Sequence, residues 1–306
     1  LGDGILNLEF HTKMNTIGGG VIEGINKALD LAETEYKGLV VSNNGQHFSA
    51  GANVGMIFMM AVEQDYDELN FAVKAFQDTM MRVRYSNTPV VVAPHNLTLG
   101  GGCELTMHAD KVVAHAESYI GLVEVGVGLM PAGGGLKEIA LRSAREAKGN
   151  DILQFLKNRF TAVATAAVSK SAPEAKKMGY LSRGDVIVLN PYELLHVAKA
   201  QAVALAQAGY RSPLSSLIPV TGRYGIATIR AQLINMRDGG FISAHDEHIA
   251  TLIADTVCGG DVDPGSHVSE QWLLDKERQG FMTLLAHPKT QERIMGMLQT
   301  GKPVRN

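Results

Sequence analysis

Two glutamates, Glu104 and Glu124, are the residues of this chain best placed to carry chemistry, because each lies beside a glycine-rich segment. Glu104 follows Leu99-Gly100-Gly101-Gly102-Cys103, and Glu124 lies between Gly121 and Gly126. Glycine lets the backbone approach a ligand closely. The triple glycine follows the apolar run Val90–Ala93, which predicts a strand turning into a helix whose first amides face outward. Such a helix start favours an oxyanion, and two carboxylates nearby supply a proton donor and acceptor. The combination suits the addition of water across an activated double bond.

The composition indicates a soluble globular protein that acts on small molecules. The chain has 306 residues, of which 45% are hydrophobic and 19% charged, with a net charge of -3. No basic stripe is present to bind nucleic acid. The longest apolar run, Met56–Val62, is far below the roughly 20 residues of a membrane span, so we expect no membrane association. Two cysteines, Cys103 and Cys258, cannot build a disulfide framework, which favours a cytoplasmic location.

Strands and helices alternate in the first half of the chain, which predicts an α/β fold. We expect strands over residues 5–10, 39–41, 90–93, 111–114 and 119–120, and helices over residues 21–32, 65–84, 136–148, 172–178 and 192–209. Beyond Pro213 the pattern is helical to the end. We therefore expect a core over residues 1–187 and a helical region over residues 188–306. The chain starts at Leu1, and the hairpin dipeptide Asp3-Gly4 lacks an upstream strand, so we expect a fragment of a longer protein.

Three segments give the chain its resemblance to a known family. These are Phe48–Asn53, Leu99–Leu105, and Glu124 with Pro131–Gly134, and together they resemble the crotonase superfamily of enoyl-CoA hydratases and isomerases. More narrowly, the chain resembles the hydratase module at the end of bacterial bifunctional proteins with an NAD-dependent 3-hydroxyacyl-CoA dehydrogenase upstream. The resemblance implies a ββα spiral core that binds acyl-CoA, and a C-terminal helical region that covers the site and builds a trimer.

The resemblance also implies a role for individual residues. The amides of Ala52 and Gly101 form the oxyanion hole, where two fixed donors stabilise charge on the thioester oxygen. Glu104 and Glu124 share the activation of the water added at C3 and the delivery of a proton at C2. Family members that only shift double bonds commonly lack the first carboxylate, so hydration is favoured. The residues implied to bind substrate are Ala50, Gly51, Asn53, Met56 and Gly100.

The implied function is the enoyl-CoA hydratase step of fatty-acid β-oxidation, from trans-2-enoyl-CoA to 3-hydroxyacyl-CoA. Coenzyme A enters as part of the substrate, and NAD is expected only in an upstream part. Isomerase and thioester hydrolase chemistry use the same oxyanion hole and stay open as alternatives. So does a non-catalytic module that binds acyl-CoA or supports assembly of a fused dehydrogenase.

The sequence departs from the family pattern at a few positions. Asn53 stands where aspartate is usual, Val123 where proline is usual, and Asn96 and Ala132 where glycine is common. Asparagine tolerates positive φ, so the change at Asn96 is mild. Val123 immediately precedes Glu124 and bears on the orientation of that carboxylate.

Several other patterns have simpler explanations. The run His245–His248 lacks the i, i+4 spacing of a zinc helix, and Ser243 with Asp246 matches a helix capping box. Gly18–Gly20 is not a dinucleotide fingerprint. The methionine-rich run Met56–Met60 either lines an acyl tunnel or packs in a core or oligomer face. Single basic residues that could meet CoA phosphates are Lys13, Lys302 and Arg305, although such residues are usually solvated. Apolar residues suggesting a non-monomeric state are Leu217, Ile218, Leu233, Ile234, Ile249, Leu252, Ile253, Trp272 and Leu273.

Overall fold

The computed structural model describes residues 1–306 and divides into two compact units. Unit 1 comprises Leu1–Asn53, Ala75–Gly121 and Val168–Leu214. Unit 2 comprises Val54–Lys74, Leu122–Ala167 and Ser215–Asn306. Each unit therefore draws on three separate stretches of chain, and the expected division at residue 187 stays a prediction.

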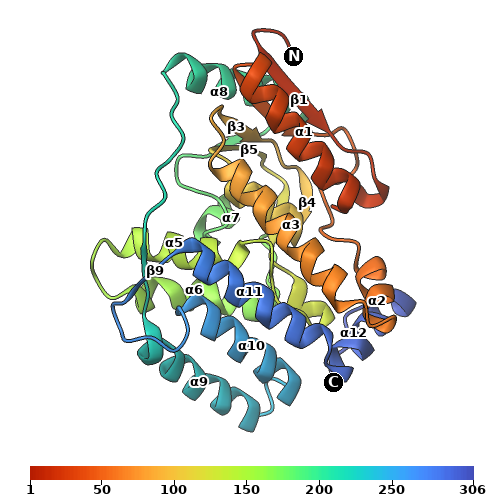
Figure 1. Cartoon of the computed structure of the whole chain (residues 1–306), viewed down its shortest axis with the longest axis vertical. Helices are drawn as coiled ribbons and strands as arrows, with labels where there is room; N and C mark the ends of the chain where they lie inside the picture. The colour runs from red at the N-terminus through yellow and green to blue at the C-terminus, as the bar shows by residue number, and fades with distance from the viewer. The chain divides into compact units, whose positions relative to one another are not determined.

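A parallel five-stranded sheet forms the centre of unit 1 (Figure 1). Its strands, in spatial order, are β1 (Ile5–Glu9), β2 (Gly38–Ser42), β3 (Val90–Val92), β5 (Lys111–His115) and β7 (Val186–Val188). The first four lie where the sequence predicts strands, whereas β7 was not predicted.

Helices cover both faces of this sheet, which explains why the central strands β2 and β3 are buried along their whole length and apolar without alternation. On one face Leu39 and Val41 pack with Leu29 of α1 (Gly19–Glu35). On the other face Val40 packs with Ala198 of α8 (Leu194–Gln207). Part of α3 (Tyr66–Arg84) joins the first layer, and η3 (Pro191–Glu193) leads into α8.

A second, two-stranded sheet leads to the triple glycine. Strand β4 (Asn96–Leu99) pairs in parallel with β6 (Ser118–Gly121), and helix α4 (Gly101–His108) starts directly after β4. The sequence predicted the helix but not β4, because Asn96 has a φ of 48° and only two residues of the strand are apolar. The short helix η1 (Lys13–Asn15) also lies in unit 1.

Helix α7 (Ala172–Met178) has the predicted ends, since Ser171 is its N-cap and Gly179 its left-handed C-cap. Ser171 Oγ accepts from the Glu174 amide, as in one half of a capping box, whereas the Glu174 carboxylate accepts from the Lys170 amide rather than from the Ser171 amide.

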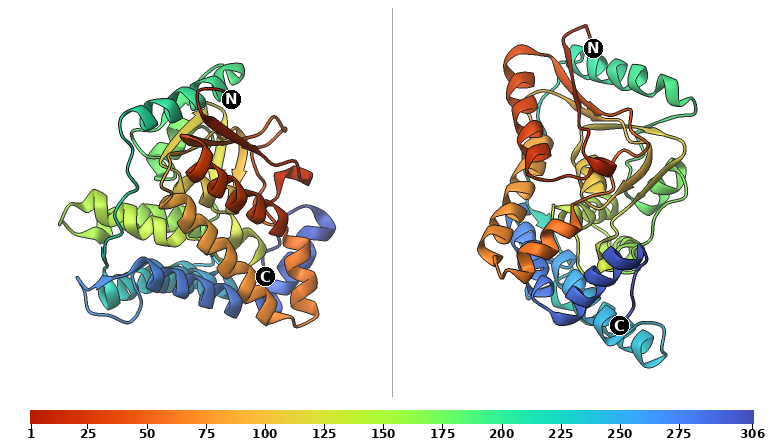
Figure 2. Two further views of the ribbon diagram at one scale, coloured as in Figure 1. Left: turned by 45° about the horizontal axis from the view of Figure 1, so that its top comes forward. Right: turned by 90° about the vertical axis from the view of Figure 1, so that its right-hand side faces the viewer.

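Unit 2 is mainly helical, which confirms the helical C-terminal region. Its elements are α2 (Val54–Val62), η2 (Glu124–Val127), α5 (Gly135–Ala147), α6 (Ile152–Ala164), α9 (Gly222–Asp238), α10 (Ala244–Val257), α11 (Glu270–Leu285), α12 (Pro288–Thr300) and the antiparallel pair β8 (Ile218–Pro219) and β9 (His267–Val268). In the left view of Figure 2, α5 and α6 form a yellow-green layer above the blue α11. The strands β8 and β9 have two residues each, too few to show a periodic pattern.

Burial separates the apolar residues of unit 2 into two groups. Ile218, Leu233 and Leu273 are buried within the chain itself, so they need no second subunit. Leu217 and Trp272 stay exposed. Of the alternatives for Met56–Met60, packing in a core does not occur, since Ala61 is the only buried residue of α2. An acyl tunnel and an oligomer face stay open as predictions. No helix has the length and hydrophobicity that crossing a membrane requires.

Candidate active site

The two segments that carry the predicted oxyanion-hole amides, Ser49–Ala52 and Leu97–Gly101, run side by side in unit 1. The Ser49 amide donates to the Leu97 carbonyl (3.0 Å), and the Leu99 amide donates to the Ser49 carbonyl (2.9 Å). Ser49 and Thr98 thereby form a parallel bridge. This pairing extends β4 and brings residues 50–52 next to the start of α4.

Glycine is required where the two segments touch. A Cβ on Gly51 would lie 2.9 Å from the Leu99 carbonyl oxygen and 3.4 Å from the Gly101 nitrogen, and Gly51 has a φ of +89°. A Cβ on Gly102 would lie 2.6 Å from the Cβ of Ser49. The glycines therefore set how closely the amides after them can approach one another.

The amides of Ala52 and Gly101 differ in their hydrogen bonding from those of Ala50 and Gly100. The Ala50 amide donates to the Met14 carbonyl (3.1 Å), and the Gly100 amide to the Gly121 carbonyl (2.9 Å). Neither Ala52 nor Gly101 donates to another backbone group. Gly101 opens α4, where the first amides have no partner within the helix. The two predicted donors are thus left available for a ligand.

Glu104 lies in the first turn of α4 and is 2% exposed. Its backbone is fixed at both ends, because its amide donates to Gly100 and its carbonyl lies 2.7 Å from Nδ1 of the buried His108. A carboxylate in this turn is favoured by the helix dipole. Glu104, Ala52 and Gly101 therefore belong to one rigidly bonded part of unit 1.

Glu124 belongs to unit 2, where it opens the single 3-10 turn η2 and is partly buried. Val123 precedes the turn with a φ of -114° and provides no side-chain cap. The Leu129 amide donates to the Glu124 carbonyl (3.0 Å), and Gly128 ends the turn with a φ of 83°. The turn thus forms without the proline usual at position 123.

The segment Pro131–Gly134 precedes α5, whose start is capped from a distant helix. Glu277 of α11 is fully buried and accepts from the amides of Gly134 (2.8 Å) and Lys137 (2.5 Å). The Lys137 ammonium, also fully buried, pairs with Glu138 (2.7 Å) and Glu270 (3.1 Å). Sequence reasoning missed this network. The available signal was that a glycine N-cap cannot satisfy the amides that follow it.

The remaining predicted residues are exposed or engaged elsewhere. Asn53 and Met56 are exposed at the beginning of α2. Ser243 and Asp246 form the predicted capping box of α10. Arg305 pairs with Asp246 at 2.6 Å.

A separate cavity of about 560 Å³ lies in unit 1 and contains none of the predicted catalytic residues. Its lining includes Asn43, His95 and His115, near the carboxyl ends of β2, β3 and β5. These side chains are bonded within the protein, as His95 Nε2 lies 2.8 Å from the Gly45 carbonyl and His115 Nε2 lies 3.2 Å from the Leu189 carbonyl. Burial lowers the pKa of His95.

Comparison with known proteins assigns the chain to a family. The family model described as enoyl-CoA hydratase/isomerase matches residues 2–183. A Bacillus subtilis protein named "Probable 3-hydroxyacyl-CoA dehydrogenase" is 42% identical over all of this chain. The chain belongs to the enoyl-CoA hydratase/isomerase family, the crotonase superfamily.

Solved structures show the same fold at low identity. A carnitinyl-CoA dehydratase from Mycobacterium thermoresistibile matches with a TM-score of 0.70, at 18% identity, over 98% of this chain and 88% of that one. An enoyl-CoA hydratase from Bacillus halodurans matches with a TM-score of 0.63, at 13% identity, over 97% of each chain. The chain spans 38% of the length of the Bacillus subtilis relative.

Proposed function

We propose that this chain is an enoyl-CoA hydratase module, which adds water to trans-2-enoyl-CoA and gives 3-hydroxyacyl-CoA. The observation that carries the proposal is the pairing of the Ser49–Ala52 and Leu97–Gly101 segments, which leaves the Ala52 and Gly101 amides without backbone acceptors. Glu104 follows in the same helix turn. The alternatives that share the oxyanion hole are outcomes of the tests below.

The proposed reaction follows from charge development on the substrate. The Ala52 and Gly101 amides donate to the thioester oxygen, which draws electron density from C3 of the conjugated double bond. One of the two carboxylates, that of Glu104 or that of Glu124, accepts a proton from water as the oxygen of this water bonds to C3. The other carboxyl group, in its protonated form, delivers its proton to C2 as the negative charge returns from the thioester oxygen. The elements of one water molecule are added, and no cofactor takes part.

A kinetic comparison of two glutamate variants tests this role. We expect Glu104→Gln to lower the rate of crotonyl-CoA hydration by about 10²–10⁴, because the variant keeps the shape of the side chain but cannot exchange a proton. Glu117→Gln is the matched control, since Glu117 is exposed and lines the separate cavity. Its rate should stay near that of the unchanged chain. A folded Glu104→Gln protein with normal turnover would refute the assignment.

We further propose that this module works beside a 3-hydroxyacyl-CoA dehydrogenase on one polypeptide. The name of the Bacillus subtilis relative and the 38% of its length that the chain spans support the idea. The product of hydration carries the hydroxyl that such an enzyme oxidises, with NAD bound outside this chain. The intact polypeptide should reduce NAD when given crotonyl-CoA and water. Hydration without NAD reduction would remove this second proposal and leave the first.

We also propose that the chain assembles into an oligomer of trimer type. Leu217, Ile234 and Trp272 of unit 2 keep 60%, 40% and 46% of their surface exposed, and a contact between subunits would remove this apolar surface from water. Light scattering at micromolar concentration should give a mass above that of one chain. A monomer at all concentrations would exclude this assembly.

A further inference from the structure

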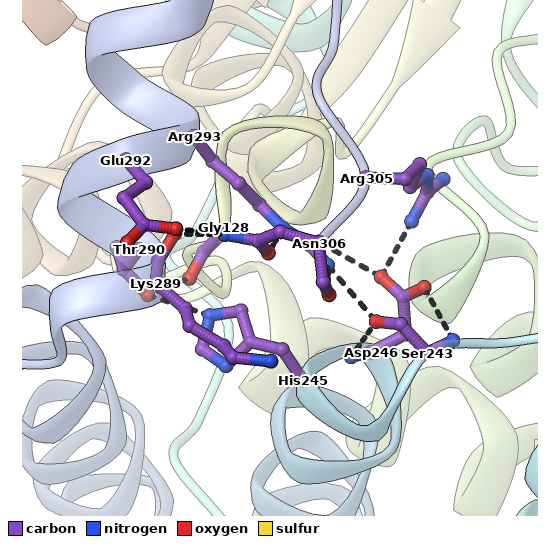
Figure 3. A network of polar contacts seen from close by, with 10 residues as sticks. All are labelled: Gly128, Ser243, His245, Asp246, Lys289, Thr290, Glu292, Arg293, Arg305 and Asn306. Carbon is purple, nitrogen blue, oxygen red and sulfur yellow. Dashed lines mark hydrogen bonds and ion pairs between the residues drawn. The ribbon is translucent and has the colours of Figure 1, made fainter.

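The turn that carries Glu124 is bonded to a buried polar network of unit 2 (Figure 3). The Gly128 carbonyl, at the end of the turn, accepts a hydrogen bond of 2.7 Å from the hydroxyl of Thr290 in α12. Thr290 is fully buried. Water therefore cannot replace this bond, and the position of the turn depends on it.

The Thr290 hydroxyl is held in turn by a histidine of α10. Nε2 of His245 lies 3.0 Å from Thr290 Oγ1. Because the single hydroxyl proton goes to Gly128, the histidine nitrogen must donate, so we assign the ring its proton on Nε2. Burial, together with the charge of Arg293, lowers the pKa of His245 to about 4. The ring stays neutral near pH 7, so His245 donates to the Thr290 hydroxyl, and this hydroxyl donates to the Gly128 carbonyl.

Helix α12, which supplies Thr290, is held against α10 by a buried ion pair. Arg293, one turn further along α12, is fully buried and donates from Nη1 to Asp246 (2.8 Å) and from Nε to Asn306 Oδ1 (2.8 Å). Asp246 also forms an ion pair with Arg305. A buried arginine and carboxylate restrict α12 to one position relative to α10.

Gly128 fits closely against this helix. A Cβ there would lie 3.0 Å from the Thr290 Cα and 3.1 Å from the Arg293 Cδ, and the φ of +83° disfavours any side chain. A single 3-10 turn has little stability of its own. Val123 does not fix φ at the other end as a proline would. At its Gly128 end the turn that carries Glu124 is therefore held by two bonds, from the Leu129 amide to the Glu124 carbonyl and from Thr290 to the Gly128 carbonyl.

We propose that Thr290 is a positioning residue for Glu124, and that its hydroxyl, oriented by His245, fixes the end of the turn that carries the carboxylate. The proposal rests on the proposed role of Glu124 in hydration. It assigns a catalytic purpose to the C-terminal helices α10 and α12, beyond packing.

The test compares three threonine variants in the whole chain with crotonyl-CoA. Thr290→Val keeps the shape and removes the hydroxyl, and should lower kcat by about 10- to 100-fold, because a displacement near 1 Å is costly for an acid-base group. KM should change little, since the oxyanion amides of unit 1 are untouched. Thr290→Ser restores the hydroxyl and should recover most of kcat. Thr256→Val is the matched control, because Thr256 is also buried but its hydroxyl donates to Leu252 of its own helix.

A second pair of variants covers the case in which Thr290→Val does not fold. His245→Gln offers a donor to Thr290 and should keep kcat closer to normal than His245→Leu, which offers none. Hydrogen exchange gives a readout besides activity, since the Leu129 amide that bonds to Glu124 should exchange faster in Thr290→Val than in Thr256→Val.

The outcomes distinguish a failure of the proposed hydratase function from a failure of the positioning role of Thr290. If the unchanged chain does not hydrate crotonyl-CoA, the proposed function is wrong. If it does, but Thr290→Val matches Thr256→Val in kcat and in Leu129 exchange, or the two His245 variants have equal kcat, the positioning role is wrong.

Discussion

Gly102→Ala tests the pairing of the oxyanion segments without removing a catalytic group. The added Cβ would start 2.6 Å from the Ser49 Cβ, and this separation must open by about 0.8 Å to reach the 3.4 Å at which ordinary van der Waals contact begins. Ser49 cannot turn aside, because its hydroxyl donates to the Asn15 carbonyl (2.8 Å) and accepts from the Gly51 amide (3.1 Å). The whole segment must move, and Ala52 moves with it.

The magnitudes predict which effect of Gly102→Ala dominates. Alanine gains up to about 1 kcal/mol over glycine in a helix, whereas overpacking a tight core costs about 1–3 kcal/mol. We therefore expect a modest net loss of stability. Displacing one oxyanion donor should lower kcat by about 10²–10³, because the amides act only at a fixed separation.

The assay is crotonyl-CoA hydration, with thermal unfolding measured on the same samples. Gly24→Ala is the control, since a Cβ on Gly24 of α1 would meet no atom within 4 Å. It should gain stability and keep its turnover. A folded Gly102→Ala protein with the kcat of Gly24→Ala would refute the account of how the two segments are spaced.

Two further predictions concern buried charges. Lys137→Met removes the ammonium between the buried carboxylates Glu138 and Glu270, and should lower the free energy of unfolding by about 3–5 kcal/mol in urea titrations. The control is Lys157→Met, at an exposed position of α6, which should change the free energy of unfolding little. Equal losses in the two variants would contradict a stabilising role for the buried network. Burial raises the pKa of Asp110 to about 6, so the folded protein retains this proton to higher pH than the unfolded chain. The stability of the unchanged protein relative to Asp110→Asn should then decrease as pH rises from about 4 to 6, by at most about 1.4 kcal/mol per pH unit. A difference that is flat or increases over this range would contradict that shift.

The sequence predicted those parts of the fold that local pattern and chain composition determine. Strands β1, β2, β3 and β5 are rich in apolar residues and bounded by turn residues, and the triple glycine marked the start of α4 correctly. Strand β4 escaped prediction because its partner β6 is distant in sequence and its first residue has a positive φ.

The candidate site was predictable to the same degree. The glycines at Gly51 and Gly102 signalled close backbone contact, and the structure places them there. The support from Glu277 and Thr290 could not be predicted, because each reaches its partner across a long sequence separation. The run around His245 matched a capping box, which is present, yet the pattern contained no sign of the bond to Thr290.

Product analysis in labelled water distinguishes hydration of crotonyl-CoA from hydrolysis of its thioester and from a shift of its double bond. The chain is incubated with crotonyl-CoA in water that carries heavy oxygen and deuterium, and the products are identified by mass spectrometry. The account predicts 3-hydroxybutyryl-CoA with one heavy oxygen on C3, one deuterium on C2 and the thioester intact. Heavy oxygen in a free carboxylate with release of coenzyme A, a displaced double bond without heavy oxygen, or unchanged substrate would contradict it.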